Sequence, residues 1–130
     1  MIYLDSSAII KLALEETESA ALRSYLESRD ELPQLTSDLA MVEVPRAVSR
    51  SQPLGLTAAY AALQRMEKVP ISPSVLMSAA SLPPLTLRSL DAIHLSSALA
   101  YYRDLTAFVT YDKKLLEAAT FHDLPVASPS

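Results

Sequence analysis

The segment Met1-Ile2-Tyr3-Leu4-Asp5-Ser6-Ser7-Ala8 decides how the rest of the chain is interpreted. Its apolar residues 2–4 predict a short buried strand, and residues 6–12 predict a helical turn directly after it. Asp5 then lies at the carboxyl end of the strand, and the carboxyl ends of strands form the ligand-binding edge of a parallel α/β sheet. Asp5 is therefore a candidate functional residue. The alternative is that it only caps the following helix.

Strand and helix patterns alternate along the remaining chain. Further strands are expected at 33–36, 69–72, 107–110 and 125–127, and helices at 15–29, 39–50, 57–68, 74–81, 89–102 and 112–121. Pro45 should bend or divide the helix in which it lies. The alternation predicts an α/β fold: one domain over residues 1–130, with a central, mainly parallel β-sheet flanked by α-helices.

The composition excludes several classes of protein. Half of the residues are hydrophobic and 20% are charged, which is typical of a packed domain. The chain has no cysteine for disulfides or thiolate metal sites, and its single glycine excludes a glycine-rich phosphate loop. The longest uncharged run, 69–87, contains four prolines and does not predict a membrane-spanning helix. Because the first strand leaves no room for a secretion signal, we expect a cytoplasmic protein without a membrane partner.

Four acidic residues occupy unusual places: Asp5, Glu43, Asp91 and Asp112. Glu43 interrupts an apolar helical run, and a buried unpaired carboxylate costs several kcal/mol or becomes protonated. Four carboxylates in one place would also repel one another, so a shared multivalent cation is the simplest explanation. Oxygen ligands alone favour Mg²⁺, with Mn²⁺ as the alternative. Such an ion can activate a water molecule to attack a phosphodiester.

Each of these acids also has a structural alternative. Asp112 can cap its helix and Asp91 can interact with a helix dipole, whereas Glu43 can face solvent or pair with Arg46 or Arg50. The net charge of −4 equals the charge of the four acids, so neutralising them leaves a chain that does not strongly oppose a polyanion.

Other polar side chains near these acids are of two kinds. The hydroxyls of Ser6, Ser7 and Thr110 can orient a carboxylate, a water or a phosphate, although capping is the favoured role for Ser6. His94 is interpreted as a packed histidine with a local hydrogen bond, because a zinc site would need further ligands. Arg46 and Arg50 share a helix face and can meet phosphates, with solvated surface charge as the alternative.

Four segments, in order, resemble PIN-domain ribonucleases and particularly the VapC toxin family. They are Ile-Tyr-Leu-Asp-Ser-Ser-Ala (2–8), Thr-Ser-Asp-Leu-Ala-Met-Val-Glu-Val-Pro-Arg (36–46), Leu-Arg-Ser-Leu-Asp-Ala-Ile-His-Leu-Ser-Ser-Ala (87–98) and Phe-Val-Thr-Tyr-Asp (108–112). The resemblance spans nearly the whole chain. Pro45 departs from the helix that the resemblance leads us to expect.

The resemblance implies an Mg²⁺- or Mn²⁺-dependent endoribonuclease that acts as the toxin of a toxin–antitoxin pair. Asp5 and Asp91 are the first candidates for direct metal ligands, Glu43 and Asp112 complete the metal and water network, and Thr110 matches the family's hydroxyl position. An RNA substrate, a homodimer and a VapB-like antitoxin whose tail covers the pocket are also implied.

Two other classes of function remain open from the residues. One is a catalytically silent PIN-like interaction domain, in which the acids bind the basic tail of an antitoxin. The other is a receiver-like, phosphate-responsive signalling module, which also gathers acids at strand ends. A haloacid-dehalogenase-like phosphatase is less favoured, because Ser7 stands where that family requires a second aspartate.

Overall fold

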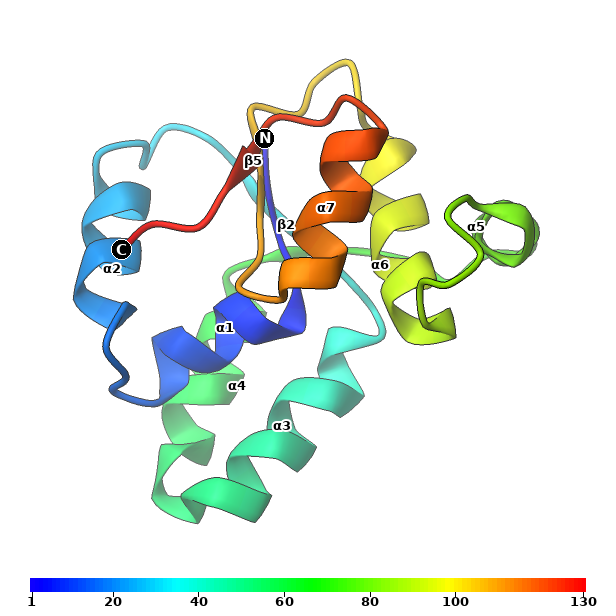
Figure 1. The fold of residues 1–130 in the computed structure, drawn as a ribbon. Coiled ribbons are helices and arrows are strands. Elements are labelled where there is room, and N and C mark those ends of the chain that lie inside the picture. Colours follow the sequence, from blue (N-terminus) through cyan, green and yellow to red (C-terminus); the bar gives the residue numbers. More distant parts are fainter.

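Strands and helices alternate along the chain in the computed structural model, which describes residues 1–130 (Figure 1). The strands are β1 (Ile2–Leu4), β2 (Gln34–Ser37), β3 (Glu67–Val69), β4 (Ala107–Val109) and β5 (Val126–Ala127). The α-helices are α1 (Ser6–Ala13), α2 (Ser19–Glu27), α3 (Ala40–Ser51), α4 (Leu56–Gln64), α5 (Pro73–Ser81), α6 (Ser89–Leu99) and α7 (Lys113–Phe121). A short 3₁₀ helix, Pro53–Gly55, precedes α4.

The five strands form one sheet in the order β3-β2-β1-β4-β5, and every neighbouring pair is parallel. This confirms the predicted α/β fold with its central parallel sheet. The chain builds outward from β1 to β3 and then returns to the other side of β1, so the strand order reverses between β1 and β4. Because Leu4 is in register with Val109, Asp5 and Thr110 emerge side by side at this reversal. In open parallel sheets, ligands bind outside the carboxyl ends of the strands at such a point.

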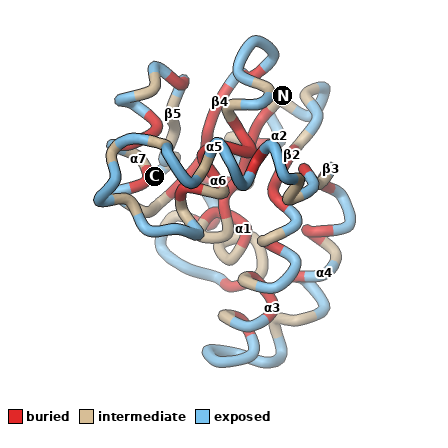
Figure 2. The backbone as a smooth tube through the Cα atoms, turned by 90° about the vertical axis from the view of Figure 1, so that its right-hand side faces the viewer, coloured by how far each residue is buried: buried red, intermediate tan, exposed pale blue.

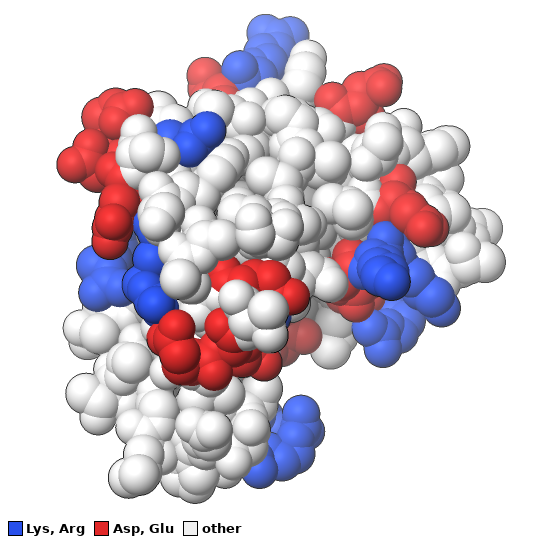
Figure 3. Space-filling view, turned by 60° about the vertical axis from the view of Figure 1, so that its left-hand side comes forward, with Lys and Arg blue, Asp and Glu red and all other residues white.

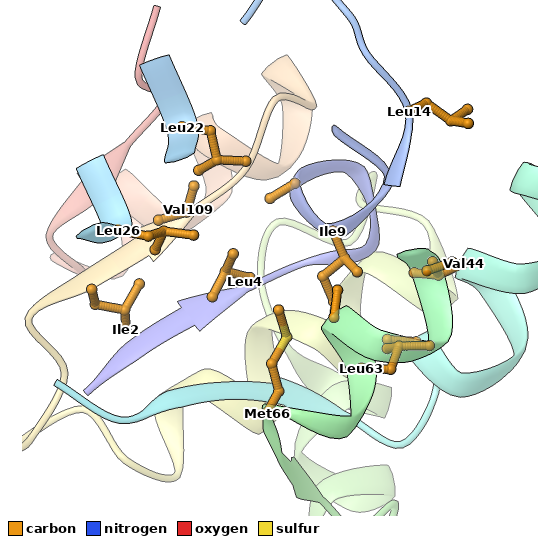
Figure 4. Packing of buried hydrophobic residues seen from close by; sticks show 14 of the residues in the cluster. Ile2, Leu4, Ile9, Leu14, Leu22, Leu26, Val44, Leu63, Met66 and Val109 are labelled. Carbon is orange, nitrogen blue, oxygen red and sulfur yellow. The ribbon is translucent and has the colours of Figure 1, made fainter. Parts of the chain in front are cut away.

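Strand β1 is buried on both faces because helices cover both sides of the sheet. Ile2 and Leu4 belong to the core cluster formed with α1 to α4, whereas Tyr3 belongs to the cluster formed with α6 and α7. This division follows from the alternation of side chains along a strand. Figure 4 shows Leu4 among the side chains of the first cluster, with Leu22 and Leu26 of α2 nearby. The continuous apolar run at residues 2–4 is therefore the signal of a strand covered on both sides.

The third strand lies earlier in the chain than the apolar pattern predicts. Helix α4 ends at Gln64, and β3 occupies Glu67–Val69, so the predicted helix 57–68 and strand 69–72 are wrong at this junction. Pro70 has no backbone N–H and cannot extend a hydrogen-bonded strand. Glu67 is exposed at the edge of the sheet, where a charged side chain stays in solvent. Because Glu67 is charged, a prediction from apolar residues missed the start of this strand.

Pro45 does not divide its helix, so of the two predicted effects, a bend or a division, the division is wrong. Helix α3 is a single element that contains Pro45, whose ring is buried. Proline at this position removes the hydrogen bond to the carbonyl group of Met41, four residues earlier. Met41 lies in the first turn of α3, and the residue is 41% exposed.

Helix α5 is the outermost element and packs against α6. Only Val75 of this helix is buried, and most of its length is exposed in Figure 2, in contrast to the buried strands. None of the helices has both the length and the apolar character needed to cross a membrane.

The two core clusters predict a sharp difference between two leucines of neighbouring elements. Leu63 is fully buried in α4, whereas Leu54 is 99% exposed. Leu63→Ala should lower the free energy of unfolding by about 2–5 kcal/mol, because it leaves a cavity, and Leu54→Ala should change it by less than about 0.5 kcal/mol. Urea denaturation of both variants checks this, and equal losses of stability would contradict the described packing.

Candidate active site

Four helices begin close to the carboxyl ends of β1 and β4, in the lower central part of the molecule (Figure 1). Each of them brings one of the four predicted acids. Asp5 is the N-cap of α1 and Asp112 the N-cap of α7, while Glu43 and Asp91 lie in the first turns of α3 and α6. The positive end of a helix dipole favours a carboxylate at each of these positions.

The Asp5 carboxylate is almost fully buried, with 3% of the residue exposed, and both of its oxygens accept hydrogen bonds. Oδ1 accepts from the Ala8 amide at 3.0 Å and from the Ser7 hydroxyl at 2.6 Å, and Oδ2 accepts from the Thr110 hydroxyl at 2.6 Å. Burial raises the pKa of Asp5, although the bonds from Ser7 and Thr110 oppose this rise. Asp5 thus caps α1, which confirms the structural alternative, and its functional role stays a prediction.

Further hydrogen bonds fix the loop after β4 against the start of α1. The Thr110 hydroxyl accepts from the Asp112 amide at 3.1 Å, and the Ser7 hydroxyl accepts from the Tyr111 amide at 2.9 Å. Oδ1 of Asp112 accepts from the Leu115 amide at 3.0 Å and so caps α7. Ser7 and Thr110 therefore hold two of the acids in fixed positions.

Asp91 and Asp112 share the guanidinium group of Arg88. Its Nε lies 3.4 Å from Oδ2 of Asp91, and its Nη2 lies 3.4 Å from Oδ2 of Asp112. Burial, and then the nearby Asp112 charge, raise the pKa of Asp91, while Arg88 opposes this rise. The Arg88 side chain is 75% exposed and its contacts are long. The two carboxylates therefore repel each other around a weakly held cation.

Glu43 is held by side chains other than those that the sequence suggested. Its Oε1 accepts from the Ser6 hydroxyl and from Nε2 of His94, both at 2.7 Å. Burial alone would raise the pKa of Glu43, but these hydrogen bonds outweigh it and the pKa is lowered. Neither Arg46 nor Arg50 forms an ion pair with Glu43, so that alternative is wrong, and Ser6 bonds to Glu43 rather than capping α1.

His94 is packed, as expected, but its hydrogen bonds are not local. The residue is 2% exposed, and its Nδ1 lies 2.7 Å from the Tyr3 hydroxyl on β1. Its other ring nitrogen bonds Glu43, which is 51 residues away along the chain. The only local signal was a histidine in an apolar helix, and nothing near it indicated either partner.

We call Asp5, Glu43, Asp91 and Asp112 together the acidic centre. The chemistry of its donor atoms fits a hydrated divalent cation. No three histidine, aspartate or glutamate side chains converge closely enough to ligate one ion together. Mg²⁺ does not need such a cluster, since it usually retains several waters and binds through one or two carboxylates. The pair Asp91 and Asp112 already accommodates a cationic group, that of Arg88. Carboxylates of this kind suit Mg²⁺ or Mn²⁺ better than a soft metal.

Comparison with known proteins gives full-length relatives. The PIN domain family model matches residues 2–120. Ribonuclease VapC35 of Mycobacterium tuberculosis is 44% identical over 131 residues, which cover 99% of this chain and 97% of that protein. Ribonuclease VapC46 of the same species is 43% identical over 129 residues, covering 99% of this chain and 98% of the relative.

Solved structures share the fold at lower identity. The crystal structure of VapC20 from Mycobacterium tuberculosis, described as a sarcin–ricin loop cleaving toxin, has a TM-score of 0.70 at 14% identity, covering 91% of this chain and 95% of its own. The structure of VapBC2 from Rickettsia felis, bound to a DNA fragment from its promoter, has a TM-score of 0.69 at 18% identity, with full coverage of both chains. Together with the family match and the full-length relatives, these similarities show that the chain belongs to the PIN-domain family and resembles its VapC members.

Proposed function

We propose that this protein is a divalent-metal-dependent endoribonuclease that acts as the toxin of a VapBC-type pair. The observation that carries the proposal is the buried Asp5 carboxylate, held by Ser7 and Thr110 where the strand order reverses. Relatives named Ribonuclease VapC are 41–44% identical over essentially the whole chain and support RNA as the substrate.

Asp5 and Asp91 would hold the Mg²⁺ or Mn²⁺ ion, with Glu43 and Asp112 on its waters. When bound, the ion supplies an activated water and offsets negative charge on the phosphate. Oε1 of Glu43 takes both of its hydrogen bonds, which leaves Oε2 free to orient a water and to accept its proton. The exposed Arg88 can turn from the acids toward an RNA phosphate.

The alternatives are less well supported. The receiver-like hypothesis rested only on acids at strand ends, which the PIN family match now explains. A silent interaction domain is less well supported, because the full-length relatives are named ribonucleases and all four acids are present in this chain. As partners we include a VapB-like antitoxin and a second copy of this chain, and as location the cytoplasm. The VapBC2 structure supports the antitoxin.

Removal of the Asp5 charge or of the metal should abolish RNA cleavage. Asp5→Asn keeps the shape of the side chain but loses a carboxylate, so we expect cleavage to fall by at least about a hundredfold, the scale of losing one placed electrostatic group. A chelator should do the same to the wild-type protein, and Mn²⁺ should restore activity. Gel mapping of the RNA ends measures both effects. The matched control is Asp30→Asn, at an exposed aspartate on the surface, and cleavage that survives both treatments would contradict the metal mechanism.

Repulsion within the acidic centre predicts a thermal signature of cation binding. Asp91→Asn should raise the melting temperature of the metal-free protein, because it removes one of two repelling charges. Since the folded-state pKa of Asp91 is raised, its penalty is present at neutral pH and disappears as the pH falls through that pKa. The rise in melting temperature from Asp91→Asn should therefore become smaller as the pH falls. Separately, Mg²⁺ should raise the melting temperature of the variant less than that of the wild type. Thermal scans from pH 7 to pH 4 check this, and an equal Mg²⁺ shift in both proteins would argue against Asp91 as a ligand.

We propose that Arg46 and Arg50 form a track that binds RNA phosphates and leads away from Glu43 along α3. Arg46 and Arg50 follow Glu43 by three and seven residues, so they share its helix face. Both are exposed, neither forms an ion pair, and they line an open recess of about 450 Å³ together with Pro45 and Ser49. Figure 3 shows that Lys and Arg side chains on this face lie in several separate groups, some of them beside Asp and Glu side chains, rather than in one continuous basic patch.

Removal of both arginines should therefore weaken RNA binding by a salt-dependent amount. Each phosphate contact with single-stranded RNA contributes about 0.7 to the slope of log affinity against log salt concentration, so the double variant Arg46→Ala, Arg50→Ala should lower that slope by about 1.4. Arg103→Ala is the control, because Arg103 is exposed and precedes the amino end of β4, whereas the acids follow the carboxyl ends of the strands. Fluorescence anisotropy over a salt series measures the slope, and identical slopes for all proteins would exclude the track.

A further inference from the structure

A buried chain of hydrogen bonds connects the sheet to the acidic centre. The Tyr3 hydroxyl lies 2.7 Å from Nδ1 of His94, and Nε2 of His94 lies 2.7 Å from Oε1 of Glu43. Tyr3 is completely buried and His94 is 2% exposed, so water does not compete for the bond between them. The Tyr3 ring is itself stacked on Phe108 of β4, with ring centres 5.2 Å apart and planes 2° from parallel. The chain therefore starts at a rigid point of the core.

The direction of these bonds follows from the Glu43 carboxylate, which can only accept, so the hydrogen of the bond to Oε1 lies on Nε2 of His94. Because Nε2–H donates to Glu43, Nδ1 of a neutral His94 is unprotonated and accepts from the Tyr3 hydroxyl, 2.7 Å away. His94 therefore accepts from the sheet and donates to the Glu43 carboxylate.

These bonds act on one oxygen of Glu43 and leave the other unoccupied. Oε1 accepts from both His94 and Ser6, and Oε2 has no hydrogen-bond partner within the protein. A glutamate side chain has three rotatable bonds, and two donors on one oxygen fix which way the second oxygen points. Placement of a reacting group within a fraction of an ångström strongly affects rate.

We infer that His94 is a positioning residue, which Tyr3 orients and which aims the free oxygen of Glu43 into the acidic centre. This role rests on the proposed function, because the aimed oxygen matters only if the centre carries out hydrolysis. A histidine that only fills the core would instead affect stability without a specific effect on turnover. The two possibilities predict different kinetics.

Two substitutions at His94 separate the donor from the packing. His94→Leu fills the space but removes the donor, whereas the amide nitrogen of His94→Gln reaches about the place of Nε2 and can still donate to Glu43. We expect His94→Leu to lower kcat by about 10–100-fold, the usual effect of losing an outer hydrogen-bond partner, with KM nearly unchanged. His94→Gln should recover most of kcat, even if its melting temperature falls.

A third substitution tests the link to the sheet. Tyr3→Phe keeps the ring but removes the hydroxyl that orients His94, so kcat should fall several-fold. Because Tyr3 acts through His94, adding Tyr3→Phe to His94→Leu should reduce kcat no further, which is the non-additivity expected of groups acting as one unit.

The measurements are steady-state cleavage of a labelled RNA and thermal melting, performed on all four variants and the wild type. Full kcat in His94→Leu would overturn the positioning role. Equal losses of kcat in the Leu and Gln variants, in proportion to their losses of melting temperature, would also overturn it. If the wild-type protein cleaves no RNA, the proposed function itself is wrong. The two outcomes above would overturn only the positioning role of His94 and would leave the proposed function standing.

Discussion

The burial of the Asp5 carboxylate beside β4 is the constraint on which the site depends. An aspartate removed from water in this way requires compensating donors, and the register of β1 and β4 supplies them by placing Thr110 next to Asp5. Ser7, in the first turn of α1, supplies another. The same two hydroxyls accept amide hydrogens from the loop that leads to Asp112. One buried charge therefore determines the geometry of both the strand ends and the loop after β4.

Asp91 and Asp112 repel each other, so this part of the centre favours a cation beside them. Helix N-termini and the Arg88 guanidinium offset part of the repulsion between Asp91 and Asp112, but the pKa of Asp91 is still raised by burial and by its neighbour. Glu43 differs from these two, because hydrogen bonds from His94 and Ser6 hold its pKa low. The centre thus contains carboxylates in distinct environments. Such differences suit a site in which some groups bind a cation and another handles a proton.

Residues at strand ends were predictable, and residues that meet from distant elements were not. The pattern of apolar residues followed by an acid indicated the places of Asp5 and Asp112, because a strand end has a known relation to the ligand edge of a parallel sheet. The contacts of Glu43 with Ser6 and His94 join residues 37 and 51 positions apart. They depend on how α3 and α6 dock, which no local pattern encodes. β3 was misplaced for a different reason, because the charge of Glu67 reflects a solvent-exposed sheet edge.

The central claim is that the four acids form one cation site, and diffraction from crystals soaked in Mn²⁺ tests it most directly. Data collected at the manganese absorption edge would locate the ion independently of any assay of activity. Our account predicts an anomalous peak between Asp5 and Asp91, with the Arg88 guanidinium withdrawn from Asp91 and Asp112. An empty centre at saturating Mn²⁺, with Arg88 still in contact with both aspartates, would contradict it.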